Sequence, residues 1–191
     1  SLDPNVSIVF KVTPATIAEI ESFPNGIAYV SRIQTTRQSQ QVQKLTEKNI
    51  TGFSMHLIPR TTLAQSMDAL SSQANISGYK SVLVGATHLP VYMPLLMTAA
   101  GTIPPAKVLI LGAGVAGLQA IATAKRLGAQ VEAFDVRPEV KEQVESLGAK
   151  FVEVASDSDD GVGKGGYAKE TSDDYKQRQQ ALIKEHIAKS N

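Results

Sequence analysis

Three glycines at the spacing Gly-x-Gly-x-x-Gly give the sequence its clearest chemical signal: Gly112, Gly114 and Gly117. They directly follow the apolar residues 108–111, which predict a strand, and they open residues 115–127, which predict a helix. In this context the motif is typical of a loop that binds the pyrophosphate of a dinucleotide, because a helix N-terminus offers N–H groups and partial positive charge to phosphate. A tight strand–helix turn without a ligand is the alternative interpretation.

Each glycine has its own expected role in such a loop. Gly112 permits the tight turn, Gly114 lets the backbone approach the pyrophosphate, and Gly117 allows the helix to pack closely on the strand. We therefore assign the whole segment to the candidate cofactor site: Gly112, Ala113, Gly114, Val115, Ala116 and Gly117.

An acidic residue, Asp135, follows the next predicted strand, residues 130–134. At this place in a dinucleotide-binding fold a carboxylate accepts hydrogen bonds from the adenosine ribose, and its charge repels a 2′-phosphate, which favours NAD over NADP. Arg137 leaves NADP open, because an arginine beside the acid can accommodate a 2′-phosphate; surface packing or an adenine contact is its other expected role. Val136 lies between them and is assigned to the same site.

The composition excludes several other kinds of chemistry. The sequence of 191 residues has no cysteine, which rules out disulfides, cysteine–zinc sites, iron–sulfur clusters and thiol nucleophiles. The 3 histidines are widely spaced, so we expect no metal site. The 19 Lys and Arg residues nearly balance the 18 Asp and Glu residues, which argues against a dedicated nucleic-acid binder. An apolar run of about 18 residues, as a membrane-spanning helix needs, is missing from the sequence.

Short apolar runs alternate with helix-forming stretches along the chain, which predicts parallel α/β structure. The predicted strands are residues 6–12, 26–30, 50–57, 107–111, 130–134 and 150–154, and the predicted helices are residues 15–22, 38–49, 65–86, 115–127, 138–147 and 173–188. Small residues and two prolines at residues 99–105 predict a stiff boundary. We therefore predict a partial α/β domain over residues 1–100 and a Rossmann-like dinucleotide-binding domain over residues 101–191.

Three sequence blocks resemble, in order, the NAD(H)-binding domain of proton-translocating nicotinamide nucleotide transhydrogenase. They are residues 59–79, residues 98–137 with the glycine motif, and residues 165–170. The resemblance covers nearly the whole chain and is far more specific than the glycine motif alone. Because the chain is shorter than that family's domain at both ends, we expect an internal fragment or truncated product. Its dinucleotide fold would be truncated in the C-terminal half.

The resemblance also assigns residues to the nicotinamide end of the cleft: Arg60, Gln65, Asp68 and Ser71. If residues 65–71 begin a helix, three of these side chains share one broad face that can hydrogen-bond a carboxamide and a ribose. The alternative is an ordinary helix N-terminus with a solvated polar face. Tyr167 matches the tyrosine of a loop that closes over the nucleotide, and a disordered surface loop is the alternative there.

The activity implied by the resemblance is direct hydride transfer. NADH bound by this chain would meet NADP⁺ bound by a separate domain, and the reaction would be coupled to proton passage through a membrane domain. NAD(H) is thus the expected cofactor, with NADP(H) only on a partner. The resemblance also implies a homodimer that binds no nucleic acid. We expect it to be soluble, at the cytoplasmic or matrix face of an energy-coupling membrane, and attached to that membrane through its partner domains. Transfer between two nicotinamides needs no general acid or base, so the protein would position the rings and exclude water.

Two other functions remain open from the sequence. The first is an alanine dehydrogenase-like oxidoreductase, because that family is similar in fold and Lys11 could match its substrate-binding lysine. Residues 31–33 supply no imidazole, however, where the matching histidine is expected. The second is a non-catalytic module that binds NAD and transfers no hydride.

Overall fold

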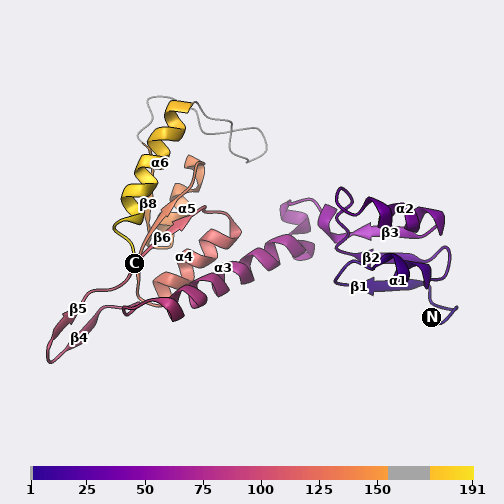
Figure 1. Cartoon of the computed structure of the whole chain (residues 1–191), viewed down its shortest axis with the longest axis horizontal. Helices are drawn as coiled ribbons and strands as arrows, with labels where there is room; N and C mark the ends of the chain where they lie inside the picture. Colours follow the sequence, from indigo (N-terminus) through magenta and orange to yellow (C-terminus); the bar gives the residue numbers. More distant parts are fainter. Residues whose placement is uncertain (1, 155–172) are drawn as a thin grey trace. The chain divides into compact units, whose positions relative to one another are not determined.

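The computed structural model of the chain describes residues 2–154 and 173–191. It divides into two compact units, Ser1–Ser72 and Gln73–Asn191 (Figure 1). Each unit contains a three-stranded parallel sheet with helices packed on it. The predicted α/β class is therefore confirmed. Among the described residues, no helix is both long and apolar enough to cross a membrane.

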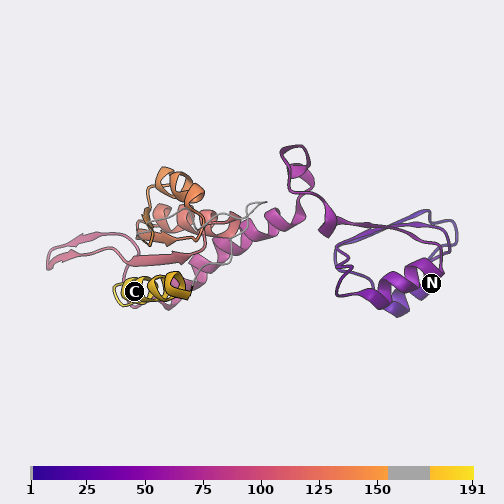
Figure 2. The ribbon, with the colours of Figure 1, turned by 90° about the horizontal axis from the view of Figure 1, so that it is seen from above.

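The first unit alternates strands and helices along the chain. Its elements are β1 (Ile8–Lys11), α1 (Ile17–Glu21), β2 (Ala28–Ser31), α2 (Ser39–Glu47), β3 (Thr51–Ser54) and the 3₁₀ helices η1 (Met55–Leu57) and η2 (Thr62–Met67). The strands pair in the order β1-β2-β3, and both α-helices lie on one face of the sheet, as two successive crossovers of the same hand require (Figure 2).

Tyr29 on the central strand β2 is at the middle of this unit's core. Side chains alternate across a strand, so Tyr29 and Ser31 are buried on the helix-covered face, while Ala28 and Val30 point to the other face. The ring of Tyr29 lies 5.4 Å from that of Phe23, centroid to centroid. The other buried apolar residues of the cluster are Ala15, Ile20, Ile27, Ile33, Leu45 and Ile50.

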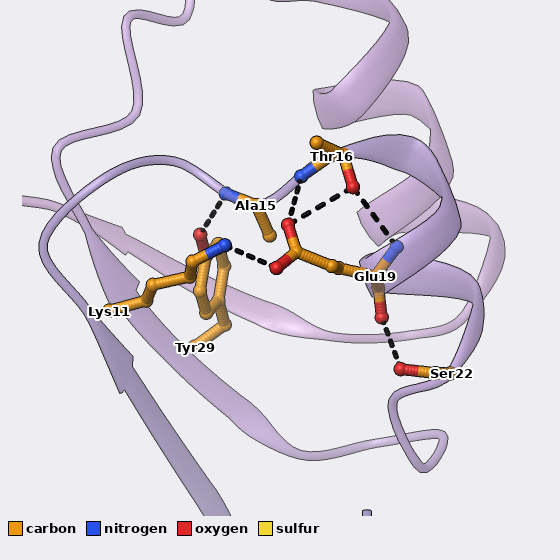
Figure 3. A network of polar contacts seen from close by, with 6 residues as sticks. All are labelled: Lys11, Ala15, Thr16, Glu19, Ser22 and Tyr29. Carbon is orange, nitrogen blue, oxygen red and sulfur yellow. Dashed lines mark hydrogen bonds and ion pairs between the residues drawn. The ribbon is translucent and has the colours of Figure 1, made fainter. Parts of the chain in front are cut away.

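A polar network fixes the start of α1 (Figure 3). Thr16 and Glu19 form a capping box, in which the Glu19 N–H donates to the Thr16 hydroxyl and the Thr16 N–H donates to the Glu19 carboxylate. Lys11 Nζ donates to Glu19 Oε1 over 2.5 Å, and the Ala15 N–H donates to the Tyr29 hydroxyl over 2.7 Å. Lys11, the residue that could match a substrate-binding lysine, is thus engaged in an ion pair within this network.

The network predicts that Glu19 contributes to the stability of the fold and that this contribution is lost in acid. The Lys11 hydrogen bond and the Thr16 bonds lower the pKa of Glu19 from 4.5 to about 2. A carboxylate with a depressed pKa stabilises the fold fully above its ordinary pKa, and this stabilisation is lost as the pH falls from about 4.5 towards 2. An NMR titration should therefore place the Glu19 midpoint near 2, and Lys11→Met should move it upwards. A midpoint that Lys11→Met leaves unchanged would contradict this cause.

The second unit contains the other parallel sheet and an antiparallel hairpin. Its elements are α3 (Ala69–His88, which begins in the first unit), β4 (Leu96–Thr98), β5 (Gly101–Ile103), β6 (Lys107–Leu111), α4 (Val115–Arg126), β7 (Gln130–Phe134), η3 (Pro138–Val140), α5 (Lys141–Ser146), β8 (Lys150–Val152) and α6 (Asp173–Ile187). The parallel strands lie in the order β6-β7-β8, and the hairpin pairs β4 with β5.

The two faces of this second sheet carry different helices (Figure 2). On β7, Val131 and Ala133 are buried in a cluster with α4 and α5. Glu132 points to the opposite face, where its Oε2 lies 2.5 Å from His186 Nδ1 on α6. The apolar core of the unit therefore lies between the sheet and α4, while a polar contact attaches α6. The buried residues of that core include Ala120, Ile121, Ala124, Val140, Val144, Ala149 and Phe151.

The structure differs from the sequence prediction around α3 and the predicted boundary. The compact units divide between Ser72 and Gln73, inside α3, earlier along the chain than the boundary predicted at residue 101. Residues 99–105, predicted as a stiff boundary, contain the turn and the second strand of the β4–β5 hairpin, in which the Thr98 hydroxyl donates to the Gly101 carbonyl over 2.9 Å. Local composition resembles a linker here because the turn residues are small.

Gly78 lies inside an uninterrupted α3. A Cβ at Gly78 would lie 2.0 Å from the Ala116 carbonyl oxygen of α4. Close by, the Asn75 side-chain amide donates to Gln119 Oε1 over 3.0 Å. Gly78 is therefore a point of close approach between α3 and α4, and it brings α3 against the helix that follows the glycine motif.

Candidate functional site

The glycine motif forms the turn between β6 and α4, as its sequence context predicts. Gly112 has φ +99°, in the left-handed region that favours glycine, and its N–H donates to the Phe134 carbonyl over 2.7 Å. This hydrogen bond ties the turn to the carboxyl end of β7. The two neighbouring strand ends therefore share one edge of the sheet, which is where ligands bind in open α/β folds.

Gly117 and Gly114 have opposite surroundings. A Cβ at Gly117 would lie 1.8 Å from the Gly112 carbonyl oxygen, so a side chain there would collide with the turn itself. A Cβ at Gly114 would meet no heavy atom of the described residues within 4 Å, so its backbone borders open space. These surroundings agree with the separate roles expected of the two glycines, close packing and close approach of a ligand.

The N-terminus of α4 suits an anionic group. Gly114 is its N-cap and, being glycine, offers no side-chain cap to the first N–H groups of the helix. Gly114 and Val115 are exposed, Ala116 is partly buried and Ala113 is buried. Backbone N–H groups at such an open helix start can donate to phosphate oxygens, so the residues present fit a pyrophosphate.

Asp135 connects the end of β7 to this turn. Its carboxylate accepts four hydrogen bonds, from the Ala113 N–H (2.6 Å), the Arg137 N–H (2.9 Å), Arg137 Nε (3.0 Å) and Arg137 Nη2 (3.1 Å). The side chain of Asp135 is 7% exposed and that of Arg137 25%. Asp135 thus lies beside the glycine turn, as the sequence predicts, and the Arg137 guanidinium covers it.

Burial and hydrogen bonding act in opposite directions on Asp135. Burial raises the pKa of its carboxyl, but the Arg137 side chain and the backbone N–H groups of Ala113 and Arg137 together lower that pKa below its usual value. The group is therefore a carboxylate at neutral pH, as an acceptor for ribose hydroxyls must be. Sequence reasoning missed the Ala113 N–H as a partner of Asp135, because a backbone donor leaves no signal in residue type.

The residues expected at the nicotinamide end belong to the first unit, and their local structure differs from the single helix expected. Gln65 is exposed in η2, and Asp68 lies between η2 and the start of α3 with ψ 87°. The expectation that Gln65, Asp68 and Ser71 share one helix face is therefore wrong. Asp68 ends the 3₁₀ helix and accepts from the Ser71 N–H over 3.0 Å, as an N-cap does.

Asp68 and Ser71 are nevertheless brought together. The Ser71 hydroxyl donates to Asp68 Oδ2 over 2.6 Å, and Asp68 is 8% exposed. The two hydrogen bonds from Ser71 lower the pKa of Asp68, and the positive charge of Arg60, an exposed residue, adds to this effect. The result is an ionised acceptor at the start of a helix. Tyr167 lies outside the described residues, and Val136 is partly buried between Asp135 and Arg137.

The parallel β6-β7-β8 sheet, the glycine turn and the carboxylate at the end of the second strand define a Rossmann-type α/β protein. Residues 3–77 match the family description "Alanine dehydrogenase/PNT, N-terminal domain", and residues 81–191 match "Alanine dehydrogenase/PNT, C-terminal domain". The chain belongs to the alanine dehydrogenase/PNT family.

Similar proteins within this family carry transhydrogenase names. The chain is 48% identical over 178 residues to the Haemophilus influenzae protein named NAD(P) transhydrogenase subunit alpha, covering 93% of this chain and 35% of that protein. A transhydrogenase structure from Sinorhizobium meliloti matches with a TM-score of 0.80 and 41% identity, covering 98% of this chain and 48% of that one. An L-alanine dehydrogenase structure, 24% identical with a TM-score of 0.66 over 77% of this chain and 42% of that one, shares the fold. The chain thus spans less than half the length of these relatives.

Proposed function

We propose that this chain is the NAD(H)-binding component of a transhydrogenase that transfers hydride between NAD(H) and NADP(H). The observation that carries the proposal is the Asp135 carboxylate hydrogen-bonded to the glycine turn beside the open start of α4. The similarity to transhydrogenase alpha subunits across both halves of the chain supports it. NADP(H) and the proton pathway then belong to partner domains, through which this component, as a homodimer, attaches to the membrane.

Different residues of the chain would bind different parts of the dinucleotide. Residues 112–117 would donate backbone N–H groups to the pyrophosphate, and Asp135 would accept from the adenosine ribose, with Val136 and Arg137 beside it. When bound, NADH supplies the hydride from its nicotinamide ring. No proton has to be moved to or from a side chain in that transfer, so the protein contributes orientation and exclusion of water.

The N-terminal residues would hold the nicotinamide end of the dinucleotide, and the second unit, Gln73–Asn191, would form the dinucleotide-binding domain. The Ser71 hydroxyl already donates its one proton to Asp68, so the pair presents acceptor oxygens to the N–H of a carboxamide or the hydroxyls of a ribose. Arg60 and Gln65 are exposed, so a ligand can reach them from solvent. Tyr167 would close over the bound nucleotide.

The test mixes the protein with the NADP(H)-binding partner domain, NADH and an NADP⁺ analogue whose reduced form has its own absorbance. Hydride transfer supports the proposal, alanine-dependent formation of NADH would indicate an alanine dehydrogenase, and NADH binding without either reaction would indicate a non-catalytic module. Gln65→Ala combined with Asp68→Asn should slow transfer about tenfold or more while NADH still binds, because asparagine preserves the helix cap. An unchanged rate in this double variant would exclude Gln65 and Asp68 from positioning the ring.

A further inference from the structure

The arginine that covers Asp135 makes a specific kind of contact. Arg137 Nε and Nη2 are two parallel donors, and they reach the two different oxygens of the carboxylate, Oδ1 and Oδ2, over 3.0 and 3.1 Å. This side-on fork has the donor pattern of a vicinal diol, in which two neighbouring hydroxyls donate to one carboxylate. The 2′- and 3′-hydroxyls of a ribose have this pattern as well.

All the acceptor positions of the Asp135 carboxylate are occupied while the Arg137 fork is in place. A carboxylate offers about four lone-pair sites, and those of Asp135 already accept from the Ala113 N–H, the Arg137 N–H and the two guanidinium donors. The two backbone donors belong to the turn and to the chain after β7. The guanidinium is the donor group that can leave by rotation of a side chain alone.

We propose that the Arg137 guanidinium occupies the diol-accepting edge of Asp135 and is the group that the adenosine ribose of NAD(H) displaces, so that Arg137 lowers the affinity of the site for the dinucleotide. The inference rests on the proposed dinucleotide function and adds a competition to it. The apparent affinity is then reduced by the fraction of molecules in which the fork is closed. Arg137 is a positioning and specificity residue in this scheme.

The competition also bears on the choice between NAD(H) and NADP(H). While Arg137 is held by Asp135, its charge is committed to a carboxylate and is not presented to a 2′-phosphate. A ribose with a 2′-phosphate has only one of the two hydroxyl donors needed to replace the fork, and its charge repels Asp135. The pair therefore selects against NADP(H) in two ways: Asp135 repels the 2′-phosphate, and Arg137 is held by Asp135 instead of binding that phosphate.

The direction in which one substitution changes NADH affinity distinguishes this proposal from simple charge attraction. NADH is an anion, so loss of a nearby cation should weaken its binding if Arg137 acts only through charge. If Arg137 competes with the ribose, Arg137→Met should instead tighten NADH binding about fivefold, because no guanidinium donor then has to be displaced. Arg137→Lys keeps the charge but lacks the fork, and it should also bind NADH more tightly than the unchanged protein.

The experiment titrates the protein and its variants with NADH and NADPH by calorimetry. Arg126→Met is the matched control, because it removes an exposed arginine at the end of α4, away from Asp135, and should leave NADH affinity within about twofold. Far-ultraviolet circular dichroism checks that each variant folds, and Arg137→Lys serves if Arg137→Met does not. The expected result is tighter NADH binding in the Arg137 variants and no gain for NADPH in Arg137→Met.

The outcomes distinguish failure of the proposed function from failure of the competition. If neither the unchanged protein nor any Arg137 variant binds NADH, the proposed function fails. If the unchanged protein binds NADH and both Arg137 variants bind it equally or more weakly, the dinucleotide site stands and the competition is overturned.

Discussion

Gly117→Ala is expected to destabilise the second unit by about 2–3 kcal/mol, the upper range for overpacking a tight contact. The added Cβ would lie 1.8 Å from the Gly112 carbonyl oxygen, and the next nearest atom is the Gly112 carbonyl carbon at 2.8 Å. Both atoms are backbone, so no rotation of a side chain can relieve the overlap, and the turn or α4 must shift. Alanine favours a helix over glycine by about 1 kcal/mol, which offsets only part of the cost.

Gly114→Ala is the matched control, because it places the same methyl group in the same turn but in open space. Its φ of −78° suits alanine, and its Cβ would meet nothing described within 4 Å. We expect its unfolding free energy to change by less than about 0.5 kcal/mol while its affinity for NADH falls, since the methyl group would occupy the approach of the pyrophosphate. Urea unfolding followed by circular dichroism measures the first effect, and NADH titration the second. Equal stability of the two variants would refute the packing role of Gly117.

The features of the site that sequence predicted well are those fixed by local chain geometry. The spacing of Gly112, Gly114 and Gly117 between a strand and a helix places the turn, because a tight strand–helix connection needs glycine at the first and last of these positions. Asp135 could be placed beside it because the carboxyl ends of neighbouring parallel strands lie along one edge of the sheet.

The features that sequence did not predict depend on which of several hydrogen-bond partners a residue takes. Asp68 could continue a helix or cap one, and the Ser71 N–H decides for the cap. Residues 99–105 read as a stiff boundary, but strand pairing makes residues 101–103 a strand and residues 99 and 100 a hairpin turn. The fork from Arg137 to Asp135 depends on side-chain rotation, which no spacing in the sequence encodes.

Asp135→Asn is the variant best suited to test the ribose role, and it should weaken NADH binding by about 1.5–3 kcal/mol, the contribution of a hydrogen bond to a charged group. Alanine is a poorer choice, because it would leave the Ala113 N–H, in a residue that is 1% exposed, without its acceptor. Asparagine keeps one side-chain oxygen for that N–H and removes the charge that holds the Arg137 guanidinium. The released arginine should then improve the affinity for NADPH relative to NADH.

The pH dependence of NADH binding gives this prediction a second, independent measurement. The folded-state pKa of Asp135 is below its usual value, so the carboxylate and its contribution to binding persist above that usual value and decline only as the pH falls through the lowered pKa. NADH affinity should therefore be insensitive to Asp135 ionisation between about pH 5 and 8, and the deficit of Asp135→Asn relative to the unchanged protein should be constant across that window. A deficit that shrinks from about pH 8 to about pH 5 would mean that Asp135 gains a proton in this range, and the arrangement of Arg137 and Ala113 around it could not then be the one that binds ribose.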